Sequence, residues 1–310
     1  MSANTPPPAG ASTRPLPRTI PEYLAQLREA LRGSDPALIQ DALYDAEEYL
    51  RSELAERKGE DEQSVIAAVA SSYGAPEEVA DIYRDTETQV ATALRTPAPP
   101  PRSTALGKFF GVVADPHTYT SMFYMLLSLA TGIFYFTWAV TGMSLSLGLS
   151  ILIIGLPFLV LFFGSVRGLS VVEGRIVEAM LGERMPRRPL YAERGQPLMA
   201  RITAMFTDPR SWSTLLYMLL MLPLGIFYFT LTVTMLSVSL SFIAAPFIWL
   251  FGGHVGYSID GYVGPDPNWL APLLFPIGVV LLFAFMHLAR GIGRMHGQLA
   301  KHLLVRSAEG

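Results

Sequence analysis

The chain has 310 residues, of which 51% are hydrophobic and only 16% are charged, and its formal net charge is −3. This composition is too apolar for a soluble protein of this size. Because the sequence contains no cysteine, it excludes disulfides, thiolate nucleophiles, iron–sulfur clusters and cysteine-ligated zinc.

The charge divides the chain into an acidic head and a basic remainder. Residues 1–18 are rich in Pro, Ser, Thr and Ala, which predicts a disordered leader rather than a secretory signal. Residues 19–96 hold 17 acidic and 7 basic side chains, a net charge of −10, and the rest of the chain carries +7. Because an acidic segment is poorly suited to phosphate backbones, we expect no direct nucleic-acid partner. We assign an acidic helical domain to 19–95 and a Pro-rich linker to 96–107.

The acidic head is expected to form three to four short helices. Its apolar residues recur at helical spacing and are separated by acidic side chains. Proline in a first turn and glycine just past a last turn are typical helix boundaries. The expected starts and stops are, in chain order, Pro21, Gly33, Pro36, Gly59, Asp61, Gly74 and Pro76.

The segments EYLAQLREAL, IQDALYDAEEYLRSELAERKG and SSYGAPEEVADIY resemble, in this order, the HAAS-type helical domain of bacterial membrane proteins. The resemblance implies a cytosolic signalling domain that is often linked to PadR-type transcriptional regulators. It also implies a partner-facing corner at Gly74, Pro76, Glu77 and Glu78. The alternative from the residues alone is a bundle that folds and anchors without signalling.

The rest of the chain contains long stretches without charge. Residues 118–166 and 211–259 are each 49 residues without Asp, Glu, Lys or Arg, and 267–289 adds 23 more. At about 1.5 Å per residue, 49 helical residues reach about 74 Å, enough to cross a hydrocarbon layer of about 30 Å twice. Hydropathy alone therefore predicts five spans.

An internal repeat favours four spans instead. With a shift of 93 residues, 115–137 aligns with 208–230 and 13 of 23 positions are identical. With a shift of 123 residues, 154–169 aligns with 277–292. The second copy is therefore the first copy with 30 residues inserted between its two helices. Two crossings in each unit predict parallel repeats related by an axis along the membrane normal.

These observations predict an all-α fold, in which a small cytosolic helical bundle precedes an integral-membrane helical bundle of two parallel two-helix repeats. The membrane domain is assigned to 108–306, with repeat one at 108–182 and repeat two at 201–306. Four spans place every Lys and Arg of this domain on one side of the bilayer, as the positive-inside rule requires. We therefore expect a multi-pass protein of the bacterial inner membrane with both termini in the cytosol.

One apolar segment, Leu236–Phe251, fits this topology poorly because it is hydrophobic enough to cross the bilayer. Pro246, Gly252 and Gly253 favour an interfacial or re-entrant hairpin on the outer face. A five-span topology remains the alternative.

The segments MLLSLATGIFYFTWAVTGMSLSLGL, GSVRGLSVVEGRIVEAMLG and LARGIGRMHGQLAKHLL resemble the sensor domain of bacterial membrane proteins. In some of those proteins the domain precedes a histidine kinase, whose motifs this sequence lacks. The resemblance implies a sensing role in the membrane, with output through another protein.

The sequence offers little reactive chemistry. The histidines lack the i, i+3 or i+4 spacing of a helix-borne metal site, and no phosphate-binding glycine loop is present. We expect no catalytic residue, no cofactor and no metal. His287 is the only ionisable group that we expect at membrane depth, and a ring reaching the headgroups is its favoured interpretation. The aromatic runs 134–136 and 227–229 are interpreted as packing or as an aromatic belt.

Two further groups of residues are candidate site residues. The insert of the second unit is the expected sensing loop if anything is sensed, since it is polar, aromatic and absent from the first unit. The Asp-Pro pairs and the arginines that repeat in both units are expected to couple the bundle to the head. The sensing-loop candidates are Trp249, His254, Tyr257, Asp260, Tyr262, Asp266 and Trp269. The coupling candidates are Asp115, Pro116, Arg167, Asp208, Pro209 and Arg290.

Three functions remain open at this point. The favoured hypothesis is a non-enzymatic inner-membrane signalling protein whose partners are the lipid bilayer and a cytosolic protein. The HAAS resemblance suggests a PadR-type regulator as that protein, and a homo-oligomer is an option. The second hypothesis is a small transporter or flippase-like protein with its substrate at the repeat interface, although an apparent lack of buried charge disfavours ion coupling. The third is a scaffold for other membrane proteins.

Overall fold

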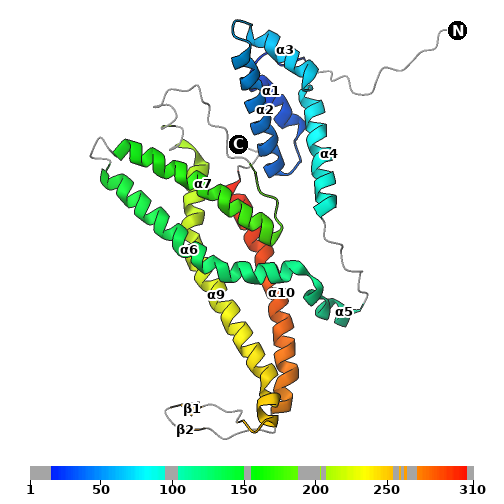
Figure 1. The fold of residues 1–310 in the computed structure, drawn as a ribbon, viewed down its shortest axis with the longest axis vertical. Helices are drawn as coiled ribbons and strands as arrows, with labels where there is room; N and C mark the ends of the chain where they lie inside the picture. The colour runs from blue at the N-terminus through cyan, green and yellow to red at the C-terminus, as the bar shows by residue number, and fades with distance from the viewer. Residues whose placement is uncertain are drawn as a thin grey trace, which may run out of the picture. The chain divides into compact units, whose positions relative to one another are not determined.

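The computed structural model describes residues 15–94, 104–149, 155–187, 203, 207–253, 258–259, 262–263 and 271–305. They form two compact units, and each unit has its own hydrophobic core. The helices of the acidic head belong to the first unit and the long apolar helices to the second, which we call the body (Figure 1).

The head contains the four helices that the sequence predicts. Asp35 caps the second helix, since its Oδ1 accepts from the N–H of Ala37 (2.8 Å). Asp61 stands at the N-cap of the third helix, but its side chain makes no capping hydrogen bond. Gly33, Gly59 and Gly74 end helices with a positive φ. The helices are α1 (Ile20–Ala30), α2 (Pro36–Glu56), α3 (Glu62–Ser72) and α4 (Pro76–Leu94).

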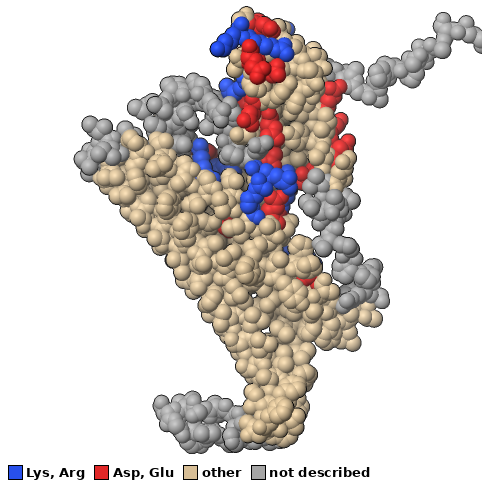
Figure 2. Space-filling model, in the orientation of Figure 1, with Lys and Arg blue, Asp and Glu red and all other residues tan. Residues whose placement is uncertain are grey.

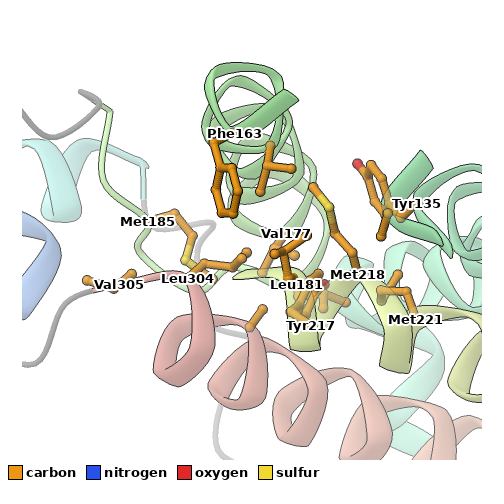
Figure 3. Close-up of a cluster of buried hydrophobic side chains, with 14 of the residues drawn as sticks. Tyr135, Phe163, Val177, Leu181, Met185, Tyr217, Met218, Met221, Leu304 and Val305 are labelled. Carbon is orange, nitrogen blue, oxygen red and sulfur yellow. The ribbon is translucent and has the colours of Figure 1, made fainter. Parts of the chain in front are cut away.

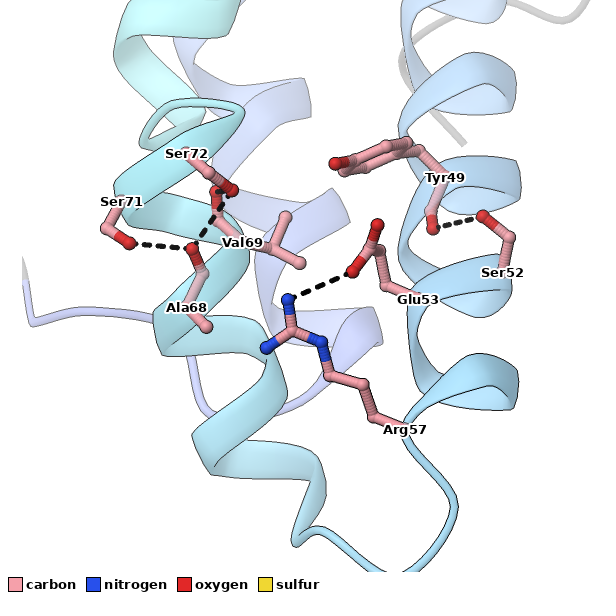
Figure 4. A network of polar contacts seen from close by, with 8 residues as sticks. All are labelled: Tyr49, Ser52, Glu53, Arg57, Ala68, Val69, Ser71 and Ser72. Carbon is pink, nitrogen blue, oxygen red and sulfur yellow. Dashed lines mark hydrogen bonds and ion pairs between the residues drawn. The ribbon is translucent and has the colours of Figure 1, made fainter.

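The head keeps its apolar stripes inside and most of its charges outside, with Asp41 as a buried exception. Tyr23, Leu27 and Leu31 are fully buried, as their spacing predicts. Figure 4 shows polar contacts of α2 and α3, where the partly exposed Arg57 at the end of α2 pairs with Glu53 (3.2 Å). Such i, i+4 pairs stabilise a helix by a few tenths of a kcal/mol, so the core carries most of the head's stability.

Four helices of the body are long and apolar enough to cross a membrane, judged over the described residues. Large apolar side chains such as Phe123 and Leu161 point outward from them, as lipid contact requires. Figure 2 shows that charged side chains are scarce on the face of the body turned to the viewer. A short helix and a 3₁₀ turn, α5 (Ala105–Phe110) and η1 (Gly111–Ala114), precede these four. The four membrane-length helices are α6 (Pro116–Leu149), α7 (Gly155–Leu181), α9 (Pro209–Leu250) and α10 (Ala271–Leu304).

The interpretation of Leu236–Phe251 as an interfacial or re-entrant hairpin is wrong. These residues continue α9, which runs unbroken for 42 residues through Pro223 and Pro246. A helix leaves fewer backbone groups without partners than any open conformation in lipid, and it therefore tolerates proline there. The five-span alternative also loses its support, because no turn separates 236–251 from the preceding span.

The inserted residues of the second unit lengthen its hairpin. Leu149 ends α6, but α9 continues eight residues past Phe242, the equivalent position. Similarly, α10 begins seven residues before Gly278, the equivalent of Gly155 at the start of α7. A two-residue antiparallel pairing of β1 (Ser258–Ile259) with β2 (Tyr262–Val263) lies between the two helices of this hairpin.

The core of the body lies where the helices of the two repeat units meet. Figure 3 shows α7 placing Phe163 and Val177 over side chains of α9, with the end of α10 close by. Met218 and Met221 of α9 fill this space, and both are buried. Unbranched methionine adapts to irregular gaps between crossing helices.

Two segments with apolar and basic residues, 103–114 and 198–207, precede the Asp-Pro starts of α6 and α9. In the first, α5 and η1 occupy the described residues. Nearly all of the second lies outside the described residues.

Candidate functional site

The two repeat units touch where α6 crosses α9. Gly132 and Gly225 are equivalent positions of the repeat, 93 residues apart. A Cβ on Gly132 would collide with the carbonyl oxygen of Met221, and a Cβ on Gly225 with that of Ser128. Ser128 and Met221 are themselves equivalent, so the contact is the same from both sides. Glycine therefore lets the two backbones approach at the crossing.

A carboxylate lies buried beside this crossing. Glu173 of α7 is 1% exposed and accepts three hydrogen bonds from tyrosine hydroxyls. Its Oε1 accepts from Tyr124 of α6 and from Tyr217 of α9, both at 2.8 Å. Its Oε2 accepts from Tyr135 of α6 at 2.9 Å. Three phenol donors on one carboxylate offset much of the cost of burying it.

An imidazole lies on the other side of the same tyrosines. His296 of α10 is also 1% exposed. Its Nε2 lies 2.7 Å from the hydroxyl of Tyr124 and 3.1 Å from that of Tyr217. Its Nδ1 lies 3.3 Å from the hydroxyl of Tyr228. Glu173 and His296 are therefore bridged by two shared hydroxyls, and we call these six side chains the Glu–His cluster.

The Glu–His cluster follows the internal repeat. The 93-residue shift relates Tyr124 to Tyr217 and Tyr135 to Tyr228, and the 123-residue shift relates Glu173 to His296. Each contact of the glutamate has an equivalent contact of the histidine. The duplicated hairpins have thus placed one acid and one base at the same position of a pseudo-twofold site.

Two ion pairs follow the same repeat relationship, and each joins one repeat unit to the other. Arg167 of the first unit lies 3.2 Å from Asp208 of the second. Arg290 of the second unit lies 2.8 Å from Asp115 of the first. The structure thus brings the four charged coupling candidates together in two equivalent pairs, each of which joins one unit to the other.

The two aspartates also start helices. Asp208 Oδ1 accepts from the N–H of Arg210 (3.1 Å), and Asp115 Oδ1 accepts from that of His117 (3.0 Å). Pro116 and Pro209 follow as the first helical residues, where a missing N–H costs nothing. Each Asp-Pro pair therefore fixes a helix start to an arginine of the other repeat unit.

Family models match both the head and the body. The family model described as "Putative sensor" matches residues 124–304, more than half of the chain. The chain belongs to this Sensor family. A second family model, HAAS, matches residues 22–82. Comparison with curated proteins and with solved structures gave no significant match.

The Sensor match contains all six residues of the Glu–His cluster, and its first residue is Tyr124. Together, the two family matches and the four membrane-length helices indicate a membrane sensor or signalling protein. These families are defined as signalling domains rather than as enzymes.

Besides His287, which the sequence singles out, the body holds two buried ionisable groups, Glu173 and His296. Glu173 and His296 were missed because Glu173 follows a charge-free stretch among other charged residues, and His296 lies among basic ones. The 123-residue shift of the internal repeat would have found them, because it aligns Glu173 with His296. Tyr135 and Tyr228 also do more than pack, since both bond to the buried ionisable pair.

His287 itself joins α10 to the segment that leads into α6. Its Nε2 donates to the carbonyl oxygen of Phe109 (3.0 Å), and its ring stacks on that of Phe109. Phe110 packs edge-on against Phe283 of α10, with 4.7 Å between ring centroids. Phe109 also lies against Phe283, so α5 is held on α10 by one hydrogen bond and three ring contacts.

The expected sensing loop is only partly described. Trp249 lies at the end of α9 and is 42% exposed, and Tyr262 begins β2. The other candidates, His254, Tyr257, Asp260, Asp266 and Trp269, lie outside the described residues. Within the described residues, no group of three His, Cys, Asp or Glu side chains could hold a metal ion.

The head corner is held by α1. The hydroxyl of Tyr23 donates to the carbonyl oxygen of Gly74 (2.7 Å), and Glu78 Oε2 accepts from the N–H of Ala75 (3.0 Å). Burial raises the pKa of the Tyr23 phenol, and the nearby Tyr73 and acidic Glu77 and Glu78 raise it further. Pro76 is buried, whereas Glu78 is exposed and Glu77 half-buried, so the corner presents its carboxylates to solvent.

Proposed function

We propose that this protein is a non-enzymatic sensor of the bacterial inner membrane. In this proposal the body responds to a membrane or envelope signal, and the acidic head passes the response to a cytosolic regulator of the PadR type. Head, basic loops and carboxyl terminus share the cytosol, which the one-sided distribution of Lys and Arg supports.

The attachment of α5 and of the α6 start to α10 is the observation that carries this proposal. Arg290 pairs with Asp115, and three residues earlier in the chain His287 holds Phe109. The segment between the head and the first span is therefore fixed to the last helix of the second repeat. A displacement of α10 relative to α6 would change the position from which the Pro-rich linker leaves the body.

The proposal is tested by transcript profiling of host strains that express the full-length chain or its variants. We expect Arg290→Ala to change the transcripts controlled by one regulator, since it frees the start of α6 from α10. The matched control is Arg294→Ala, which removes an exposed charge one turn further along α10. Equal transcript profiles for Arg290→Ala, Arg294→Ala and a deletion of residues 19–95 would contradict the proposal.

A transporter is the second candidate, and the Glu–His cluster is the observation that favours it. The expected absence of buried charge had disfavoured ion coupling, but Glu173 and His296 are both buried in the body. Ionisable groups inside helical bundles are typical of ion pathways. Solute flux in proteoliposomes that is lost in the double variant Tyr135→Phe/Tyr228→Phe would support transport, whereas flux independent of these hydroxyls would not.

A further inference from the structure

The Glu–His cluster allows its protons to be assigned from geometry. Each tyrosine hydroxyl carries one proton and can donate only one hydrogen bond. Tyr124, Tyr217 and Tyr135 donate to the oxygens of Glu173. These three phenol protons are thereby fully used, and the carboxylate acts only as an acceptor.

This assignment determines the tautomer of His296. The hydroxyl oxygens of Tyr124 and Tyr217 lie 2.7 and 3.1 Å from Nε2. In the arrangement in which both phenol protons point at Glu173, these oxygens can only accept from the ring. Nε2 must therefore carry a proton, and in the neutral ring Nδ1 is then the unprotonated nitrogen.

One position remains at which the network can gain a proton. Nδ1 lies 3.3 Å from the hydroxyl of Tyr228. In the neutral ring Tyr228 donates to Nδ1. If Nδ1 is protonated, the hydroxyl turns and accepts instead, and no other hydrogen bond of the cluster changes. The cluster then passes from a net charge of −1 to zero.

The surrounding charges leave Glu173 as the group that His296 would neutralise. The imidazole is in contact with tyrosines on α6 and α9, and two of these tyrosines also bond to the carboxylate on α7. On its own helix, Arg290 is paired with Asp115, and on the equivalent side Arg167 is paired with Asp208. Glu183 packs against Gly297, the neighbour of His296 in the chain. A buried net charge of −1 is costly, and one added proton removes it.

We propose that the Glu–His cluster is a proton-binding site, in which Nδ1 of His296 takes one proton from the aqueous phase and forms an imidazolium that neutralises Glu173 across the shared hydroxyls. Only an N–H bond forms, and the same bond breaks when the proton returns to water. This site goes beyond the proposed signalling role and does not depend on it, because proton binding requires neither the head nor a regulator.

The test is a ¹⁵N-histidine NMR titration of the full-length chain in nanodiscs of phosphatidylethanolamine and phosphatidylglycerol. The signals of His296 are identified by their loss in His296→Gln. We expect the tautomer with a proton on Nε2, which gains a second proton at Nδ1 on acidification. An Nδ1-protonated neutral tautomer would overturn the proposal.

Substitution of Glu173 tests whether its charge stabilises the protonated ring of His296. At a pH where half of His296 is doubly protonated in the natural chain, Glu173→Gln should lower the ratio of doubly to singly protonated ring about tenfold or more, as expected on losing a buried opposite charge that shares two hydroxyls with the ring. Glu178→Gln on the same helix, where Glu178 pairs with Arg184, should leave the ratio within about twofold. An unchanged ratio in Glu173→Gln would also overturn the proposal.

A third variant guards against misfolding of the first two. Tyr228→Phe removes the hydroxyl next to Nδ1 and leaves the contacts of Nε2 in place. It should shift the Nδ1 resonance and preserve that of Nε2. Equal shifts of both nitrogens would contradict the assigned proton positions.

Discussion

Glu173 and His296 lie 123 residues apart and share the hydroxyls of Tyr124 and Tyr217. They occupy the same position in two copies of one hairpin, and the copies have kept the tyrosines but diverged into an acid and a base. Two carboxylates that shared these hydroxyls would repel each other, and two imidazoles would leave the phenol protons without an anionic acceptor. The divergence therefore makes the duplicated site electrically complementary.

The pseudo-twofold relationship predicts that the two residues can be exchanged. Glu173→His or His296→Glu alone should destabilise the body by about 3–5 kcal/mol, because each leaves a buried group without its complement. The double exchange should recover most of that loss, since equivalent tyrosines face each position. Thermal unfolding of the purified chain in detergent measures all three variants. A double variant that is less stable than both single variants would contradict the equivalence.

Close approach at the helix crossing predicts a strong effect of one methyl group. Gly132→Ala should destabilise the body by about 1–3 kcal/mol, because the added Cβ collides with the Met221 carbonyl. The control is Gly164→Ala on α7, where nothing lies within 4 Å of the new Cβ. That control should be neutral or stabilise by up to about 1 kcal/mol, as alanine does in a helix. Equal effects at both positions would show that the crossing is not tight.

The dual role of Asp208 predicts a difference between two of its substitutions. Asp208→Asn keeps a capping oxygen and loses the charge opposite Arg167, whose side chain is 30% exposed. This loss should cost about 1 kcal/mol or less. Asp208→Ala also loses the cap of α9 and should cost about 1 kcal/mol more. Thermal unfolding in detergent distinguishes the two, and identical values would exclude a capping role.

The topology is testable because the chain has no native cysteine. Phe251→Cys lies just past the end of α9, at a position that is 86% exposed, and Lys301→Cys lies near the end of α10. An impermeant thiol reagent should label the first variant in intact spheroplasts and the second only after lysis. Labelling of Lys301→Cys in intact spheroplasts would place the carboxyl end outside and refute the four-span topology.

The head should lose stability in alkaline solution. Burial and the nearby Tyr73, Glu77 and Glu78 raise the pKa of Tyr23 above its ordinary value near 10. Its contribution is therefore complete below pH 10 and is lost as the pH rises above it, since the unfolded chain releases the proton first. Tyr23→Phe should cost about 1 kcal/mol at pH 7 through the lost bond to Gly74 and weaken the alkaline decline. Urea unfolding of residues 15–95 at pH 7 and pH 11, followed by circular dichroism, measures both effects.

The sequence predicted most of the architecture because the relevant signals are local. Helix boundaries in the head follow from Pro36, Asp35 and the glycines, whose backbone preferences act within one turn. The same local rules misjudged 236–251, where Pro246 and two glycines indicated a turn. In a long apolar helix the need to satisfy every backbone group outweighs a single proline.

The sequence by itself determined the acidic head, the duplicated hairpin and the four membrane-length helices, because charge, hydropathy and repetition are properties of the chain read in order. Only the tertiary structure decided that Glu173 meets His296 and that each arginine pairs with the aspartate of the other unit. Hydropathy reports the average surroundings of a segment. The surroundings of one polar side chain depend on which distant helix supplies its partner. The packing of the two hairpins against each other determines which helix that is.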